Sequence, residues 1–153
     1  FFYRLLHDIK GKVFAKISLD NLASFPSPSN LKLYSNELTS FAELNSRKVS
    51  QFQILMANFL GLLSNKLGVT KISKKLQNWY QMEGKEFLKE LSKAKVKLSL
   101  LEESEWVNYF KEQKQIAFEI KSEIDKTDKE IDQIVYRLYG LTEEEIQIIE
   151  NNI

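Results

Sequence analysis

The stretch WVNYFKEQKQIAFEIKSEIDKTDKEIDQIVYRL, Trp106 to Leu138, decides the fold expected for this chain. Mostly apolar residues recur in it at alternating steps of four and three, which is the heptad spacing of packed helices. This heptad seam consists of Trp106, Phe110, Gln113, Ala117, Ile120, Ile124, Thr127, Ile131, Ile134 and Leu138. The spacing predicts one long helix from Ser104 to Tyr139, in which the polar residues Gln113 and Thr127 fix the register.

An earlier apolar pattern supplies a partner for this helix. Between Phe41 and Leu63, apolar residues recur at steps of three and four, which predicts a helix that ends near Gly68. A shorter helix is expected to follow, with Thr70 or Ser73 as its N-cap and an interruption at Gly84. The predicted fold class is therefore mainly α, an antiparallel helical bundle or long helical hairpin. The rival prediction is a helical protein-interaction module that forms a homodimer through the seam.

The N-terminal residues have a different pattern. Both prolines of the chain, Pro26 and Pro28, lie in SFPSPSN, which predicts a boundary. Before it, the alternating stretch Val13–Ile17 predicts a short edge strand. We therefore expect residues 1–30 to be a short β or irregular segment left from a preceding domain, and residues 31–153 to form a helical domain. The apolar start on Phe1 suggests a piece of a longer protein.

Composition excludes several classes of protein. The chain has 153 residues and no cysteine, so disulfides and thiolate metal sites are excluded, which fits the reducing cytoplasm. Its longest apolar run, Ile54 to Leu63, is half of the roughly 20 residues that cross a membrane. A cytoplasmic protein without a membrane partner is expected.

Charge is unevenly distributed along the chain. Residues 62–100 hold nine lysines and three acidic residues, whereas residues 101–153 hold six basic and fourteen acidic residues. A basic middle predicts a contact with nucleic acid, although long solvated helices carry many charges in any case. The candidate phosphate-binding residues are Lys10, Lys12, Lys66, Lys71, Lys74 and Lys75. The aromatic residues Trp79 and Tyr80 could stack on bases beside them, but their spacing favours the core.

No catalytic or metal-binding constellation is visible. His7 has no suitable partner near it in the sequence, and phosphate-loop, nucleophile-elbow and HExxH motifs are absent. The acidic run after Thr142 has a structural explanation, because Thr142 and Glu145 have the spacing of a helix-starting capping box. We expect no catalytic residue, no metal and no cofactor in this chain.

The segment KEIDQIVYRLYGLTEEEIQIIE, Lys129 to Glu150, resembles the C-terminal ending of adenine-specific DNA methyltransferases from bacterial restriction–modification systems, including type IIG enzymes. The matching residues are Ile131, Asp132, Val135, Tyr136, Leu138, Tyr139, Gly140, Leu141, Thr142 and Glu145. Likewise KVFAKISLDNLASFPSP, Lys12 to Pro28, is similar to the exit of a target-recognition domain. There the matching residues are Phe14, Lys16, Ile17, Leu19, Leu22, Pro26 and Pro28, whereas Ser27 departs from the usual aliphatic residue.

The resemblance implies the end of a target-recognition domain, residues 1–30, followed by a C-terminal helical domain. Double-stranded DNA would be bound through the parent enzyme, with the upstream methyltransferase and recognition domains as partners. The Asn/Asp-Pro-Pro-Tyr motif and the Gly-rich cofactor loop are absent here. S-adenosylmethionine, and Mg²⁺ where a nuclease is present, are therefore implied for the parent alone. This chain is expected to support DNA recognition without methylating or cleaving DNA itself.

Overall fold

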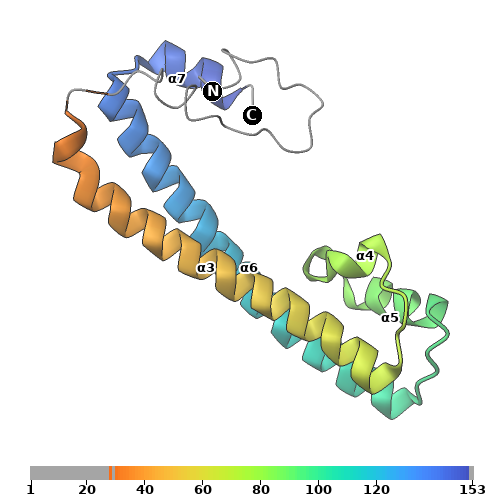
Figure 1. The fold of residues 1–153 in the computed structure, drawn as a ribbon. Coiled ribbons are helices and arrows are strands. Elements are labelled where there is room, and N and C mark those ends of the chain that lie inside the picture. Colours follow the sequence, from red (N-terminus) through yellow and green to blue (C-terminus); the bar gives the residue numbers. More distant parts are fainter. Residues whose placement is uncertain (1–27, 29, 152–153) are drawn as a thin grey trace. The chain divides into compact units, whose positions relative to one another are not determined.

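The computed structural model describes residue 28 and residues 30–151 of the chain, and this part is helical. Its elements are α3 (Leu31–Leu67), α4 (Lys74–Gln77), the 3-10 helix η1 (Trp79–Gln81), α5 (Gly84–Lys93), α6 (Leu100–Tyr139) and α7 (Glu143–Glu150) (Figure 1). No strand occurs among these residues, so the predicted mainly α class is confirmed. The strand expected at Val13–Ile17, together with His7, Lys10 and Lys12, lies outside the described residues.

The chain divides into two compact units, Ser40–Glu130 and the pair of segments Phe1–Thr39 and Ile131–Ile153. In the first unit α3 and α6 lie side by side (Figure 1). Their direction follows from two contacts: Asn45 of α3 donates a hydrogen bond to Asp128 of α6, whereas the rings of Phe59 and Phe110 lie 6.1 Å apart. Residue numbers rise along α3 as they fall along α6, so the expected antiparallel hairpin is confirmed.

The residues of the heptad seam are shielded from solvent in both units. Each of its ten positions is buried or half-buried, and Phe110 and Ala117 are fully enclosed. The polar seam residue Thr127 is 5% exposed, and its hydroxyl donates to the backbone carbonyl of Glu123 at 3.0 Å. A buried hydroxyl with such a partner avoids most of the cost of an unsatisfied polar group. The spacing in the sequence therefore predicted the buried face of α6 correctly.

Four aromatic side chains form the centre of the first unit. This aromatic core consists of Phe59, Trp79, Phe87 and Phe110, each at most 1% exposed. Phe59 stacks on Trp79 with ring centroids 4.1 Å apart, and Phe87 stacks on Phe110 at 4.5 Å. Aromatic pairs of this kind contribute about 0.5–1.5 kcal/mol beyond the burial of their area. The rings join α3, η1, α5 and α6, so the segment between the two long helices is packed onto them.

A polar layer interrupts the same pair of helices nearer to Glu130. It consists of Asn45, Lys48, Glu123, Thr127 and Asp128. Asn45 bonds to Asp128, and Lys48 forms an ion pair with Glu123. Asn45 and Lys48 occupy the places where the steps of three and four along α3 would otherwise put apolar residues. Polar groups in a helix–helix seam restrict which registers the helices can adopt, because a shifted register leaves them without partners.

Two predicted helix boundaries are wrong. The long helix begins at Leu100 rather than Ser104, because Ser99 and Glu102 form reciprocal capping hydrogen bonds. The helix expected to run from Ser73 to an interruption at Gly84 ends at Gln77 instead, although Ser73 does cap it. Gly84 then begins α5, at a place where an added Cβ would lie 3.3 Å from a methyl group of Val107. Close packing of the α5 start on α6 explains the glycine there.

The corner between α6 and α7, which belongs to the second unit, has the predicted geometry. The α6 helix ends at Tyr139, and Gly140 takes a left-handed φ of 61° that favours glycine. The N–H of Leu141 reaches back to the carbonyl of Tyr136 at 3.0 Å. Thr142 and Glu145 form the reciprocal capping box that starts α7. The helix stop and restart read from the sequence are therefore confirmed.

The motif residues of this corner differ in their surroundings. Tyr136 is 7% exposed, and its burial raises the pKa of the phenol. Tyr139 is half-buried, and Asp132 lies on the exposed side of α6. None of the helices in the described part of the chain is both long and apolar enough to cross a membrane.

Candidate nucleic-acid interface

The segment that connects α3 and α6, residues 68–99, brings together the basic part of the sequence. All three acidic residues of this connecting segment are held in ion pairs. The pairs are Glu83–Lys114, Glu86–Lys75 and Glu90–Lys93. Because the acids are used in this way, most lysines here have no acidic partner within the described residues. The segment therefore presents an excess of positive charge to solvent.

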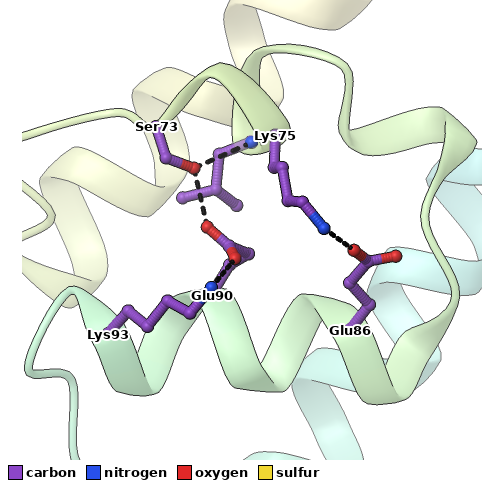
Figure 2. Close-up of polar contacts among 6 residues, drawn as sticks. Ser73, Lys75, Glu86, Glu90 and Lys93 are labelled. Atoms are coloured by element: carbon purple, nitrogen blue, oxygen red, sulfur yellow. Dashed lines mark hydrogen bonds and ion pairs between the residues drawn. The ribbon is translucent and has the colours of Figure 1, made fainter.

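Glu90 is the one buried acid among them, with 4% of its surface exposed. Its carboxylate accepts hydrogen bonds from Lys93 at 2.7 Å and from the Ser73 hydroxyl at 2.8 Å (Figure 2). These two hydrogen bonds hold the pKa of Glu90 below its usual value. The bond from Lys93 has the larger effect and the bond from Ser73 the smaller one. The same Ser73 hydroxyl accepts from the N–H of Leu76 at the start of α4. Glu90 therefore ties α4 to α5 and has the role of a structural residue.

Lys75 and Glu86 form a second link between α4 and α5, visible beside the first in Figure 2. The hydrogen bond and the charge of Glu86 raise the pKa of Lys75. Since a carboxylate already accompanies it, Lys75 is the least suited of the four described lysines of the expected set to bind a phosphate. The other described members of the expected set, Lys66, Lys71 and Lys74, are exposed. Within the part of the chain that the structure describes, none of these three forms an ion pair.

The two aromatic residues beside the lysines are part of the protein interior. Trp79 is completely buried and stacks on Phe59, so its faces are not available to a base. Tyr80 is half-buried and makes edge contacts with Phe52, at 5.2 Å between centroids, and with Phe118, at 6.2 Å. The preference for a core role, taken from the sequence, is confirmed for Trp79. The connecting segment therefore exposes lysine charge, whereas the faces of Trp79 are not exposed for stacking.

Sequence reasoning missed the lysines of α5. Lys85, Lys89 and Lys93 are exposed and recur at steps of four, whereas Phe87 and Leu91 of the same helix are buried. Lys95 and Lys97 follow in the next loop and are also exposed. The signal was present in GKEFLKELSKAKVK, Gly84 to Lys97, as lysines at helical spacing opposite apolar residues. The apolar spacing alone does not predict which lysines of this segment are exposed.

Fold and surface together define an antiparallel helical hairpin with a lysine-rich connecting segment. The chain belongs to the family described as Domain of unknown function (DUF8810), whose profile matches residues 31–135. The match begins at the first residue of α3 and ends within α6, so it includes the whole connecting segment. No curated protein and no solved structure matches the chain.

Proposed function

We propose that this chain is the C-terminal helical part of a restriction–modification adenine DNA methyltransferase of the bacterial cytoplasm, and that it supports DNA recognition. The resemblance of Lys129–Glu150 to such endings supplies the class of enzyme. The observation that carries the DNA role is the connecting segment, where ion pairs occupy every acid and leave lysines exposed. Methylation, with S-adenosylmethionine, belongs to domains upstream, and so does any Mg²⁺-dependent cleavage.

Lysines on a packed segment suit contacts to the phosphate backbone. Such contacts position a protein on the duplex without reading its sequence, and they release bound counterions. Since Trp79 is enclosed, base stacking is not offered by this surface. Base readout is assigned to the target-recognition domain. The chain then braces that domain and adds affinity that depends on salt.

The DNA role is tested by titrating the chain into a labelled short duplex of mixed sequence while fluorescence anisotropy is measured. The salt concentration is raised from about 50 mM to about 200 mM, a range over which proteins with many phosphate contacts lose most of their affinity. We expect binding at the lowest salt and a linear fall of log K with log salt. Absence of binding at the lowest salt contradicts direct DNA contact.

The enzyme class has a separate test in the gene that encodes the chain. The proposal expects a Gly-rich cofactor loop and an Asn/Asp-Pro-Pro-Tyr motif in the sequence ahead of Phe1. A parent protein that carries both, and that transfers a methyl group to adenine in duplex DNA, agrees with the proposal. A parent sequence without them contradicts the methyltransferase assignment, whatever the result of the DNA titration.

The second candidate is a helical interaction module that dimerises through the heptad seam. The seam spacing favours it, but Phe110 and Ala117 are fully buried within the chain's own first unit. A dimer through these residues would have to open that unit and replace its contacts. Light scattering over a range of concentrations tests this, since a monomer at high concentration removes the candidate.

A further inference from the structure

The outward side of α5 carries lysines and no acid. At 100° per residue, Lys85, Lys89 and Lys93 fall on one side of the helix, opposite the buried Phe87 and Leu91. Two further exposed lysines, Lys95 and Lys97, follow in the loop after the helix. We name Lys85, Lys89, Lys93 and Lys97 the α5 lysine face. Within α5, neighbours at steps of four lie about 5–6 Å apart at their Cβ atoms, so the charges of Lys85, Lys89 and Lys93 are close together.

The two acids of α5 are turned away from this face. Glu86 pairs with Lys75 and Glu90 accepts from Ser73, so both point toward α4 (Figure 2). On a typical solvated helix, acids at steps of three or four from lysines neutralise them on the surface. Here the acids serve the contact between α4 and α5. Of the four lysines in the face, Lys93 alone forms an ion pair within the described residues.

We propose that the α5 lysine face is the surface through which the chain contacts the phosphates of duplex DNA. The inference rests on the proposed function and specifies its site. It places the main contacts on Lys85 and Lys89 of α5 and on the exposed Lys97 of the loop after it, because Lys75 and Lys93 are each engaged by a carboxylate. The packing of Phe87 and Leu91 holds the helix in place, so the face is presented on a fixed element.

The nature of the side chains sets what the contact can recognise. A lysine ammonium is a point charge on a flexible stem, so it binds phosphate without the planar two-bond geometry that arginine offers. No arginine occurs in residues 48–136, which include the connecting segment. The surface is therefore suited to sequence-independent backbone binding, with strong salt dependence and little discrimination between bases.

The test compares two variants of the same net charge. The first is Lys85→Gln/Lys89→Gln/Lys97→Gln, which leaves the structural Lys93 in place. The control is Lys111→Gln/Lys126→Gln/Lys129→Gln, which removes three exposed lysines of α6. Circular dichroism and thermal melting confirm that each variant folds. Anisotropy against the labelled duplex is then measured over the salt series for both variants and the unaltered chain.

The slope of log K against log salt measures the number of phosphates neutralised, at about 0.9 per contact on duplex DNA. We expect the α5 variant to lower the slope by about 2 to 3, and the α6 control to change it by less than about 1. Equal slopes in the α5 variant and the unaltered chain overturn the inference and leave the proposed function standing. Failure of the unaltered chain to bind overturns the inference together with the direct DNA contact of the proposed function, whereas the enzyme class is decided by the parent sequence.

A different occupant of the face is also detectable. The acidic residues of α7 in a second copy of the chain could pair with these lysines, since α7 holds Glu143, Glu144, Glu145 and Glu150. Light scattering at low salt without DNA measures this association. Association that the α5 variant abolishes, and that duplex DNA does not displace, assigns the face to self-association and overturns the DNA assignment.

Discussion

The aromatic core and the polar layer of the unit Ser40–Glu130 lie on the same pair of helices and follow the same residue spacing. They differ in how far their side chains are exposed to solvent. In the aromatic core each side chain is at most 1% exposed. In the polar layer the ion pair joins Lys48, whose side chain is 28% exposed, to Glu123, which is 56% exposed. Burial of large apolar groups is the main favourable term in folding, whereas exposed ion pairs contribute little. The comparison indicates that stability comes from the core and register from the polar layer.

The largest expected effect comes from emptying the aromatic core. Phe110→Ala removes a ring that stacks on Phe87 and leaves a cavity, so we expect a loss of about 3–5 kcal/mol in the free energy of unfolding. Urea denaturation followed by circular dichroism measures it. Phe118→Ala is the control, because Phe118 is 49% exposed, and it should cost less than about 1 kcal/mol. Similar losses in the two variants would contradict the assignment of the core.

A smaller effect is expected at Glu90, the buried acid beside the core. Because its pKa is lowered in the folded state, the unfolded chain binds more protons in acid. Its contribution is complete above the ordinary value of 4.5 and is lost as the pH falls through the lower folded value. Glu90→Gln should therefore cost stability at pH 7, and the cost should shrink at pH values below 4.5.

Urea midpoints measured across this pH range give the comparison for Glu90. Glu105→Gln, at an exposed position of α6, is the matched control and should change little at either end of the range. If the loss of unfolding free energy in Glu90→Gln stays constant as the pH falls, the negative charge of Glu90 does not stabilise the contact between α4 and α5.

Making the polar layer apolar should raise stability. Asn45→Leu/Thr127→Val replaces two polar residues of the layer by apolar ones of similar size. It removes the buried Asn45 Oδ1, which has no hydrogen-bond partner in the described part of the chain, and leaves Asp128 exposed to water, so we expect a gain of about 1 kcal/mol. Asn45→Ala is the control and should lose stability, because the hydrogen bond to Asp128 disappears without added apolar contact. Urea denaturation compares the three chains. A less stable double variant would show that the layer stabilises the fold as well as fixing its register.

The smallest effect is expected for the ion pair of the polar layer. A double-mutant cycle with Lys48→Ala and Glu123→Ala should give a coupling energy below about 1 kcal/mol, since both side chains reach solvent. Repeating the cycle at high salt should reduce the coupling further. A larger coupling energy that does not change with salt would show that the ion pair is shielded from solvent more than its exposed fractions indicate.

Much of the helical fold could be predicted from local spacing. The heptad seam gave the buried face of α6, and Gly140 with Thr142 gave the helix corner, because each depends on neighbours within a few residues. The end of α3 near Gly68 follows the same logic, since Gly68 has a φ of 64°. The polar contacts of Asn45 and Lys48 were not predicted, because the spacing of apolar residues does not show which polar residues lie between two helices.

The break after Gln77 and the start of α5 at Gly84 depend on contacts between distant residues. Trp79 lies in a 3-10 helix and stacks on Phe59, and an added Cβ at Gly84 would lie 3.3 Å from a methyl group of Val107. The candidate site also depends on contacts between distant residues, so its region was predicted but its individual lysines were not. The sequence pointed to the basic middle, but which lysines are neutralised depends on Glu86 and Glu90 meeting α4.

The burial of Trp79 also gives the chain an internal optical reporter. Of its two tryptophans, Trp79 is fully enclosed between aromatic rings, whereas Trp106 is half-buried. An indole in such dry surroundings emits at shorter wavelength than one in water, and a neighbouring ring alters its intensity. A Trp106→Phe chain would emit from Trp79 alone, so its spectrum follows the packing of the core without any attached dye. Loosening of that core by a bound ligand would register as a red shift of this emission.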